Sequence, residues 1–371
     1  MSEATSLTNN GNLTVSVVRS TAGDVATYKQ LSSELRIGGV VGYAKGEASA
    51  CDNNNPLTLT TTAADNLAAN LQLGGSVGYA GAAFSGSNKG KVTVTYNGKS
   101  VRCGGVLGEG VAQGLGSACK NEGDVDVTCP NVGQSWVGGV FGSIAKPSSG
   151  TVTHSGLENR GNLSFTVTAS SNDGFYYLSG VSGTSAASQI FSGCKNYGNL
   201  TYSGDAMIRI GGINAYMNKT AHDSVVECNI TASCTGRDYS EVGGVSAYTA
   251  ATDLKNWSFK GTINTSGSTK KVYTGGLLGK VAGNAKFNGC SFDGSLTGAS
   301  GNNTPGLYSG GLQNDGKTIT FGDSAKCVVK SGSKVNGSTI TALNNDNLVS
   351  QSSDGTNGFT STGTLTNIVI E

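Results

Sequence analysis

A glycine doublet recurs along the chain at nearly regular intervals, and this repeat constrains the fold more than any other feature. Successive copies lie 30 to 41 residues apart: IGGVVGY (37–43), LGGSVGY (73–79), CGGVLGE (103–109), VGGVFGS (137–143), LSGVSGT (178–184), IGGINAY (210–216), VGGVSAY (242–248), TGGLLGK (274–280) and SGGLQND (309–315). A repeat of roughly 20–50 residues indicates that one unit is stacked many times, as in a solenoid, a propeller or an array. The chain is therefore expected to grow along one axis.

Each repeat contains segments that alternate between apolar and polar residues. Before the doublet, the positions expected to point inward include Leu71/Leu73, Val101/Cys103 and Ile208/Ile210. A second alternating segment follows an Asn-x-Gly turn in several repeats, as in Asn121-Glu122-Gly123 before VDVT. Such a period of two is typical of a strand with one buried face, and Asn and Gly tolerate the left-handed conformation of tight turns. A third short strand is expected around a recurring cysteine.

Three strands and three corners in about 32 residues predict one coil of a parallel β-helix. The fold class is therefore all-β: a right-handed parallel β-helix of nine to ten coils with terminal caps. We expect residues 1–330 to form the repeat domain, in which 1–10 could serve as an N-terminal cap, and residues 331–371 to form a C-terminal cap or assembly segment. The main alternative is a row of β-hairpins, because Asn97-Gly98 is a strong hairpin turn.

Composition excludes several classes of function. The chain has 371 residues, a net charge of +1 and only 13% charged residues, so a basic stripe for nucleic acid is not expected. No run of apolar residues is long enough to span a membrane, and the polar start MSEATS shows no signal peptide. Five of nine cysteines fall at a similar point of successive repeats, which favours a buried column of free thiols: Cys51, Cys119, Cys194, Cys228 and Cys290. A Cys228–Cys234 disulfide is the alternative.

The sequence offers no constellation for catalysis. The densest acidic group is Glu122, Asp124 and Asp126, and the neighbouring repeats add no further acids to it, so we interpret it as solvated surface. His154 and His222 fall in different repeats, so no His-based metal site is expected. We therefore predict a protein that is not an enzyme and that uses no metal or cofactor.

A column of outward residues next to the doublets is the best candidate for ligand binding. Its flanking positions point inward, so its members should point outward and stack along the rod; the predicted ligand-binding residues are Arg102, Trp136, Tyr177, Arg209, Tyr273 and Tyr308. Exposed aromatic and Arg side chains bind sugars and proteins by stacking and hydrogen bonding. The alternative is that these aromatic residues simply suit strands. A second, interrupted column holds Tyr43, Tyr79, Tyr216 and Tyr248.

The repeat, an apolar-Gly-Gly motif followed by Cys-x-Asn-x-Gly, resembles the glycine-rich GLUG-type repeats of bacterial surface proteins and haemagglutinin-like adhesins over residues 6–330. The later segments SFKG (258–261) and SFDG (291–294) depart from it. The resemblance implies an exported protein, extracellular or on the bacterial surface. We expect a non-catalytic adhesin or glycan-binding rod whose partner is a host or environmental glycan or surface protein. The alternatives are a stalk or filament subunit that self-assembles through its ends, and a polysaccharide lyase or glycoside hydrolase.

Overall fold

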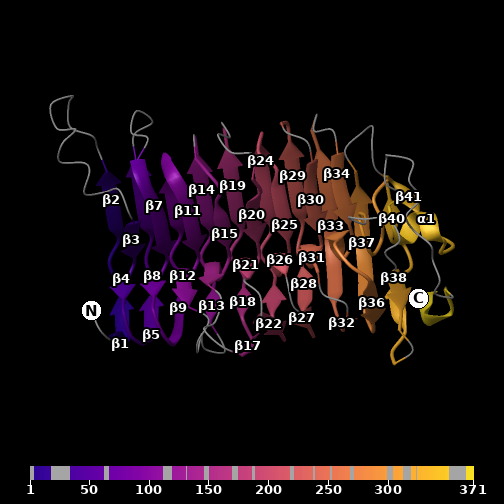
Figure 1. The fold of residues 1–371 in the computed structure, drawn as a ribbon, viewed down its shortest axis with the longest axis horizontal. Coiled ribbons are helices and arrows are strands. Elements are labelled where there is room, and N and C mark those ends of the chain that lie inside the picture. Colours follow the sequence, from indigo (N-terminus) through magenta and orange to yellow (C-terminus); the bar gives the residue numbers. More distant parts are fainter. Residues whose placement is uncertain are drawn as a thin grey trace.

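A computed structural model describes residues 4–17, 34–61, 67–111, 119–130, 132–145, 150–168, 174–185, 189–217, 221–236, 239–250, 253–267, 271–298, 304–311, 319–322, 324–350 and 365–371. It is an all-β parallel β-solenoid of about seven turns with almost no helix. The chain advances along the long axis from one end to the other, and the strands of successive turns lie side by side (Figure 1). The all-β parallel β-helix predicted from the repeat is therefore confirmed.

The doublet lies between two eight-stranded parallel sheets. Sheet B precedes it and contains β3 (Glu34–Gly38), β7 (Leu67–Gly74), β11 (Gly98–Gly104), β15 (Trp136–Gly138), β20 (Tyr176–Ser179), β25 (Ile208–Gly211), β30 (Tyr239–Gly243) and β34 (Lys271–Gly275). Sheet C follows it and contains β4 (Val41–Ala44), β8 (Val77–Ala80), β12 (Leu107–Val111), β16 (Phe141–Ala145), β21 (Ser182–Ser185), β26 (Asn214–Met217), β31 (Ser246–Thr249) and β35 (Leu278–Val281).

Sheet A closes the coil with two limbs that meet at a corner. The first limb contains β1 (Ala4–Asn9), β5 (Ala48–Asn53), β9 (Phe84–Asn88), β13 (Lys120–Asn121), β18 (Glu158–Asn159), β23 (Lys195–Asn196), β28 (Val225–Glu227), β39 (Cys327–Val329) and β42 (Ile368–Ile370). The second contains β2 (Leu13–Val17), β6 (Leu57–Thr61), β10 (Val92–Thr95), β14 (Val125–Cys129), β19 (Leu163–Val167), β24 (Leu200–Gly204), β29 (Ile230–Cys234) and β40 (Lys334–Val335). Strands β33 (Ser258–Ser266) and β37 (Ser291–Thr297) run through both limbs.

The smaller sheet D lies between sheet C and sheet A along the chain. It contains β17 (Val152–Ser155), β22 (Gln189–Ser192), β27 (Ala221–His222), β32 (Asp253–Lys255), β36 (Ala285–Asn288) and β38 (Ile319–Phe321). The remaining elements are near the C-terminus: β41 (Ser338–Thr339), the short helix α1 (Asn345–Leu348) and the 3-10 helix η2 (Leu365–Asn367). Each coil therefore passes from sheet B through the doublet to sheet C, then over sheet D where it is present, and returns through sheet A.

The doublet is required because both of its Cα atoms are tightly enclosed. A Cβ on Gly104 would lie 2.0 Å from the carbonyl oxygen of Leu107, on the strand that has just turned away. A Cβ on Gly105 would lie 2.2 Å from the carbonyl oxygen of Gly139 and 2.4 Å from Cγ of Asn121. The small residue of sheet C is enclosed in the same way, since a Cβ on Gly108 would lie 2.5 Å from the backbone nitrogen of Leu73. The prediction of close backbone approach is confirmed: Gly104 and Gly108 lie where the outer faces of sheets B and C approach each other, and Gly105 lies against the Asn121 side chain inside the coil.

Asparagines form a hydrogen-bonded ladder at the corner of sheet A, and all of them except the half-buried Asn9 are buried. Each side-chain amide donates to the side-chain oxygen of the next, over 2.7–2.8 Å: Asn9 to Asn53, Asn53 to Asn88, Asn88 to Asn121, Asn121 to Asn159 and Asn159 to Asn196. Each amide also donates to a backbone carbonyl two residues on, as from Asn121 to Gly123 over 2.7 Å. Both amide hydrogens are thereby satisfied inside the coil, which a buried polar group requires.

The Asn-x-Gly corners were predicted correctly, but the reason given for them was wrong. Among the described residues, those with positive φ do not include the ladder asparagines or the glycines that follow them. The asparagine is needed for the ladder, and the glycine is needed because successive corners stack closely. A Cβ on Gly123 would lie 2.0 Å from the carbonyl oxygen of Gly90.

The ladder ends where the sequence departs from Asn-x-Gly. Asn196 donates to the Cys228 sulfur over 3.3 Å, and the positions that continue the column are Val226, Phe259 and Phe292. The rings of Phe259 and Phe292 stack with centroids 5.8 Å apart. The later coils are therefore filled by apolar side chains at the position where earlier coils carry amides, and in the two coils that carry phenylalanine the strands β33 and β37 continue through the corner.

The described cysteines are all buried, and none forms a disulfide. The buried column of thiols is therefore confirmed for Cys51, Cys119, Cys194 and Cys290, and the Cys228–Cys234 bridge is not formed. Cys228 does not belong to this column, because its coil lacks the Asn-x-Gly corner and Ser224 takes the equivalent place.

The strand pairing also settles the hairpin alternative and the number of coils. The strands beside Asn97-Gly98, β10 and β11, belong to different sheets, and the antiparallel pairing among the described strands is β40 with β41. About seven turns are formed, fewer than the nine to ten predicted. The last doublet, Gly310-Gly311, does not begin another coil of the same register, since Gly306 pairs with Gly275 and Ser309 pairs with Leu278.

The two ends of the solenoid differ. Residues 4–9 form β1, which pairs in parallel with β5 as the first strand of sheet A. At the other end, β42 pairs with β39, and the backbone around α1 accepts hydrogen bonds from Leu307, Tyr308 and Ser309, which continues sheets B and C past the last coil. Residues 1–3 and 351–364 lie outside the described residues.

Candidate binding site at the corner of sheets B and C

Two columns of polar and aromatic side chains face each other at the doublet corner, which we call the corner ladder. Sheet B contributes Arg36, Gln72, Arg102, Trp136, Tyr177, Arg209, Glu241 and Tyr273, and sheet C contributes Tyr43, Tyr79, Glu109, Ser143, Thr184, Tyr216, Tyr248 and Lys280. Both columns point away from the coil interior. They meet because the doublet folds the outer face of one sheet toward the outer face of the other.

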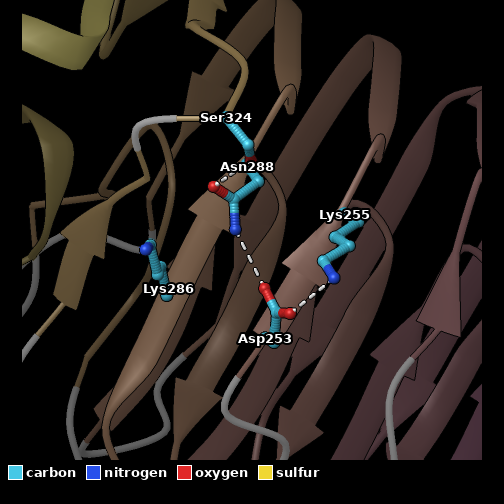
Figure 2. Close-up of a pocket in the computed structure, with 5 residues that line it drawn as sticks. All are labelled: Asp253, Lys255, Lys286, Asn288 and Ser324. Carbon is cyan, nitrogen blue, oxygen red and sulfur yellow. Dashed lines mark hydrogen bonds and ion pairs between the residues drawn. The ribbon is translucent and has the colours of Figure 1, made fainter.

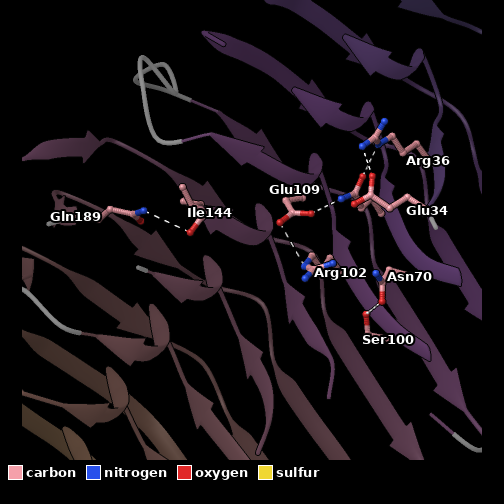
Figure 3. Close-up of polar contacts among 9 residues, drawn as sticks. Glu34, Arg36, Asn70, Ser100, Arg102, Glu109, Ile144 and Gln189 are labelled. Atoms are coloured by element: carbon pink, nitrogen blue, oxygen red, sulfur yellow. Dashed lines mark hydrogen bonds and ion pairs between the residues drawn. The ribbon is translucent and has the colours of Figure 1, made fainter. Parts of the chain in front are cut away.

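The N-terminal half of the corner ladder combines arginine with aromatic rings. The Arg36 guanidinium lies 4.4 Å from the Tyr43 ring centroid and 4.7 Å from that of Tyr79. Its Nε donates to Gln72 over 2.7 Å, and Gln72 in turn donates to Glu109. Figure 3 shows Glu109 reaching from sheet C toward Arg102 on sheet B, with 3.4 Å between Arg102 Nε and the carboxylate. These contacts form a continuous chain across the corner.

Trp136 lies in the middle of the corner ladder with a group against each face. The Arg102 guanidinium is 4.9 Å from its ring centroid, and the Tyr177 ring stacks at 5.9 Å with an interplanar angle of 1°. Tyr177 also meets Tyr216 edge to face, with centroids 6.4 Å apart. Side chains of the protein itself therefore cover both faces of the Trp136 ring, and a ligand could contact mainly the ring edge.

The C-terminal half of the corner ladder is centred on a buried carboxylate. Glu241 is fully buried, accepts a hydrogen bond from Arg209 Nε over 2.5 Å and lies 4.0 Å from Lys280 Nζ. The Arg209 guanidinium lies 3.8 Å from the Phe175 ring centroid and 4.2 Å from that of Tyr248. Two cations and several rings thus surround one carboxylate, as a buried charge requires.

Burial dominates the electrostatics of this ladder. Burial raises the pKa of the Glu241 carboxyl, while Arg209 acts to lower it. The Glu109 carboxyl behaves in the same way, with burial raising its pKa and Arg102 opposing the shift. Burial also raises the pKa of the Tyr177 hydroxyl. These carboxylates are held by neighbouring cations and are not free in solvent.

The sequence correctly placed this column on the outer face of sheet B but wrongly treated all of it as exposed. Tyr177, Arg209 and Tyr273 are 7–9% exposed, because the second column covers them. Arg102 and Trp136 are half-buried. Tyr43, at 38%, is the exposed large apolar side chain among the described residues. In the column of sheet B, the accessible part of the corner ladder is therefore its N-terminal half, at Arg36, Arg102 and Trp136.

Tyr308 was assigned to the wrong column. It is fully buried inside the last coil, where its hydroxyl donates to the carbonyl oxygen of Cys290 over 2.8 Å. The rings of Phe287 and Phe321 meet it edge to face, each with its centroid 5.1 Å away. The error arose because Gly306, and not the following doublet, continues the register of sheet B.

The acidic group that we interpreted as solvated surface makes separate contacts. Glu122 pairs with Lys120 over 2.6 Å, Asp126 pairs with Lys91 over 2.5 Å, and Asp124 accepts a hydrogen bond from the Asn162 backbone. The bond to Lys120 lowers the pKa of Glu122. Among the described residues, no three His, Cys, Asp or Glu side chains gather where they could hold a metal ion.

A shallow depression of about 510 Å³ lies over sheet D, on a different part of the coil. It is lined by Asp253, Lys255, Lys286, Asn288 and Ser324. Asp253 is held by Asn288 over 2.9 Å and by Lys255 over 2.8 Å, and the Lys255 bond lowers its pKa (Figure 2). Sequence reasoning missed this depression because strands β32 and β36 and the segment at Ser324, which are distant in sequence and share no motif, supply these side chains.

The fold and the corner ladder together define a repetitive all-β protein with one long, internally bonded surface feature. None of the described helices is long and apolar enough to cross a membrane. A comparison of the chain with family models, curated proteins and solved structures found no match.

Proposed function

We propose that this chain is a non-catalytic rod of the bacterial cell surface that acts as an adhesin and binds a glycan or a surface protein. In this proposal the coil is right-handed, as parallel crossovers almost always are. The GLUG-like repeats support the assignment to exported, extracellular adhesins. The observation that carries it is the corner ladder, which brings Arg, Tyr and Trp side chains into one line on the outer surface.

The binding site in this proposal is the N-terminal half of the corner ladder. There Arg36, Tyr43 and Tyr79 form one cluster, and Arg102 with Trp136 forms the next. Tyr43 is the most accessible ring of this half, and Trp136 is half-buried. Aromatic and guanidinium groups that are already ordered by their neighbours lose little conformational freedom on binding, which favours affinity. The C-terminal half, where Arg209, Glu241 and Lys280 are buried, stiffens the rod in this proposal.

A stalk or filament subunit is the second candidate function. It is less favoured because the C-terminal end of the solenoid is covered. Head-to-tail assembly needs two open coil ends. Here the segment around α1 and strand β42 occupies the strand edges of the last coil. A cap in this position, as proposed for residues 331–371, would keep the rod a single unit.

The test is a glycan and mucin array probed with the purified chain and with the double variant Tyr43→Ala, Trp136→Ala. We expect the wild-type protein to bind at least one glycan class and the double variant to lose at least tenfold in apparent affinity. The matched control is Tyr197→Ala, because Tyr197 is a half-buried aromatic residue packed beside an arginine, Arg160, as Trp136 is packed beside Arg102, but it lies at the corner of sheet A.

The control should bind like the wild-type protein. Circular dichroism must show that all variants keep their strand content. Equal binding by the double variant would move the site away from the corner ladder. Failure of the wild-type protein to bind any glycan or mucin would contradict the glycan proposal, and electron microscopy for filaments would then test the second candidate.

A further inference from the structure

Two cysteines occupy neighbouring positions in the interior of the last coil. Residues 291 and 292 of β37 pair with residues 328 and 329 of β39, so Cys290 and Cys327 lie directly before the paired residues on adjacent parallel strands. The Val328 backbone N–H donates to the carbonyl oxygen of Cys290 over 2.9 Å, which holds this register. Both side chains are fully buried in the same core, and the two thiols hydrogen-bond to each other.

This arrangement is unique among the nine cysteines. Along the buried column, Cys51 is followed by Gly86, Cys119 by Leu157 and Cys194 by Ser224. Cys103, Cys129 and Cys234 also pair with residues other than cysteine, and Cys228 lies beside Gly261 of the next coil. Only Cys290 and Cys327 therefore present two sulfur atoms on neighbouring strands.

We propose that Cys290 and Cys327 form a disulfide when the protein meets an oxidising environment, and that this bond locks the C-terminal segment onto the last coil. Adjacent strands lie about 4.8 Å apart, within the range of Cα separations that a disulfide spans. The bond would join β37 to β39, and β39 in turn holds β42. This inference does not depend on glycan binding.

The oxidant is a small-molecule or protein disulfide, and the exchange balances in two steps. The Cys327 thiolate attacks one sulfur of that disulfide, forms a mixed disulfide and releases one thiolate. Cys290 then loses its proton and attacks the Cys327 sulfur, which forms the protein disulfide and releases the second thiolate. Two protein thiols are oxidised and one external disulfide is reduced to two thiols. The hydrogen bond from Cys290 lowers the pKa of Cys327, which favours it as the first nucleophile.

The bond would matter because this end of the rod is otherwise held by few strands. Strand β39 has three residues and β42 has three. A terminal unit of a solenoid has only one neighbour and frays most easily. A cross-link between residues 290 and 327 also restricts the unfolded chain, which adds stability to the closed end.

The experiment is refolding of the full chain from denaturant in a buffer of reduced and oxidised glutathione, so that burial does not limit access to the thiols. Free thiols are then alkylated under denaturing conditions and counted by intact mass. We expect two fewer alkylated cysteines than in protein refolded with excess reductant, a peptide that links Cys290 to Cys327, and a higher melting temperature for the oxidised protein.

The variants Cys327→Ala and Cys290→Ala should each lose the linked peptide and the difference in melting temperature. The matched control is Cys194→Ser, which belongs to the same buried column but has no cysteine beside it, and it should keep both. If one alanine variant fails to fold, the other and the peptide map still decide. Full alkylation of all nine cysteines after oxidative refolding, or a linkage between any other pair, would overturn the proposal.

Discussion

Replacing Asn121 by alanine should destabilise the coil far more than its loss of volume suggests. The Asn121 side chain takes part in three hydrogen bonds: it accepts from Asn88 over 2.8 Å, donates to Asn159 over 2.8 Å and donates to the Gly123 carbonyl over 2.7 Å. At about 1 kcal/mol of net stability for each bond, the loss is about 3 kcal/mol. The orphaned Asn159 oxygen is fully buried, which brings the expected loss to about 5 kcal/mol.

The assay is urea denaturation followed by circular dichroism, combined with hydrogen exchange of the neighbouring coils. Exchange is needed because solenoids can unfold in segments, and the effect should be largest within one coil of residue 121. The control is Asn54→Ala, where an exposed asparagine bonds Asn10 over 3.0 Å and the expected change is within about 0.5 kcal/mol. If Asn121→Ala lowered the free energy of unfolding by less than about 1 kcal/mol, the asparagine ladder would not be a stabilising element.

Three further outcomes are expected. Gly105→Ala places a Cβ 2.2 Å from a carbonyl oxygen and should cost more than about 3 kcal/mol, whereas Gly283→Ala, with its nearest atom at 4.0 Å, should leave the melting temperature unchanged. Glu241→Gln leaves two buried cations without their carboxylate and should cost about 3–5 kcal/mol in urea denaturation, with retention of wild-type stability counting against the buried ion pairs. Burial raises the pKa of Cys103 and of Cys194 to about 12, so at pH 8 only about one thiol in 10⁴ is ionised, and iodoacetamide should label neither residue until the protein unfolds.

The sequence predicted the coil well because the repeat reports directly on backbone packing. Residues such as Leu71, Leu73, Val101 and Cys103 alternate with polar neighbours, and all four are fully buried. The small residue of sheet C is conspicuous because nothing larger than alanine fits beside the neighbouring strand. Local patterns of this kind depend on one coil and its neighbour, so they can be recognised without a structure.

The contacts within the corner ladder could not be predicted in the same way. The column of sheet B was found from its spacing, but its burial depends on how sharply the doublet turns sheet C against it. That angle is a property of the backbone and leaves no residue pattern. Lys280 and Glu109, which interrupt the tyrosine column, were the available signal, since each is charged opposite to a partner on sheet B.

The prediction for Tyr308 and the role predicted for the ladder asparagines were wrong for different reasons. The Gly310-Gly311 doublet matches the repeat in sequence, but Gly306 is the residue that pairs with Gly275 and continues the register of sheet B. The alignment of the last repeat was therefore shifted by four residues, and Tyr308 was assigned to the wrong column. The asparagines were recognised as corner residues, but a left-handed turn and a buried amide ladder have the same Asn-x-Gly sequence motif. Only the stacking of successive coils shows that the side chain points inward.

The change from amides to phenylalanines inside the rod has a consequence for how its length can vary. Duplicating or deleting a coil among those that contain Asn53 to Asn159 would leave every amide opposite another amide, so such copies could be gained or lost without an unpaired group. A copy taken from the Phe259 coils and inserted among the asparagine coils would place a ring opposite an amide, and the amide hydrogen that bonds the next asparagine would lose its acceptor. We therefore expect insertions and deletions among close homologues to respect the boundary between Asn196 and Val226, with each half of the rod lengthening only by coils of its own kind.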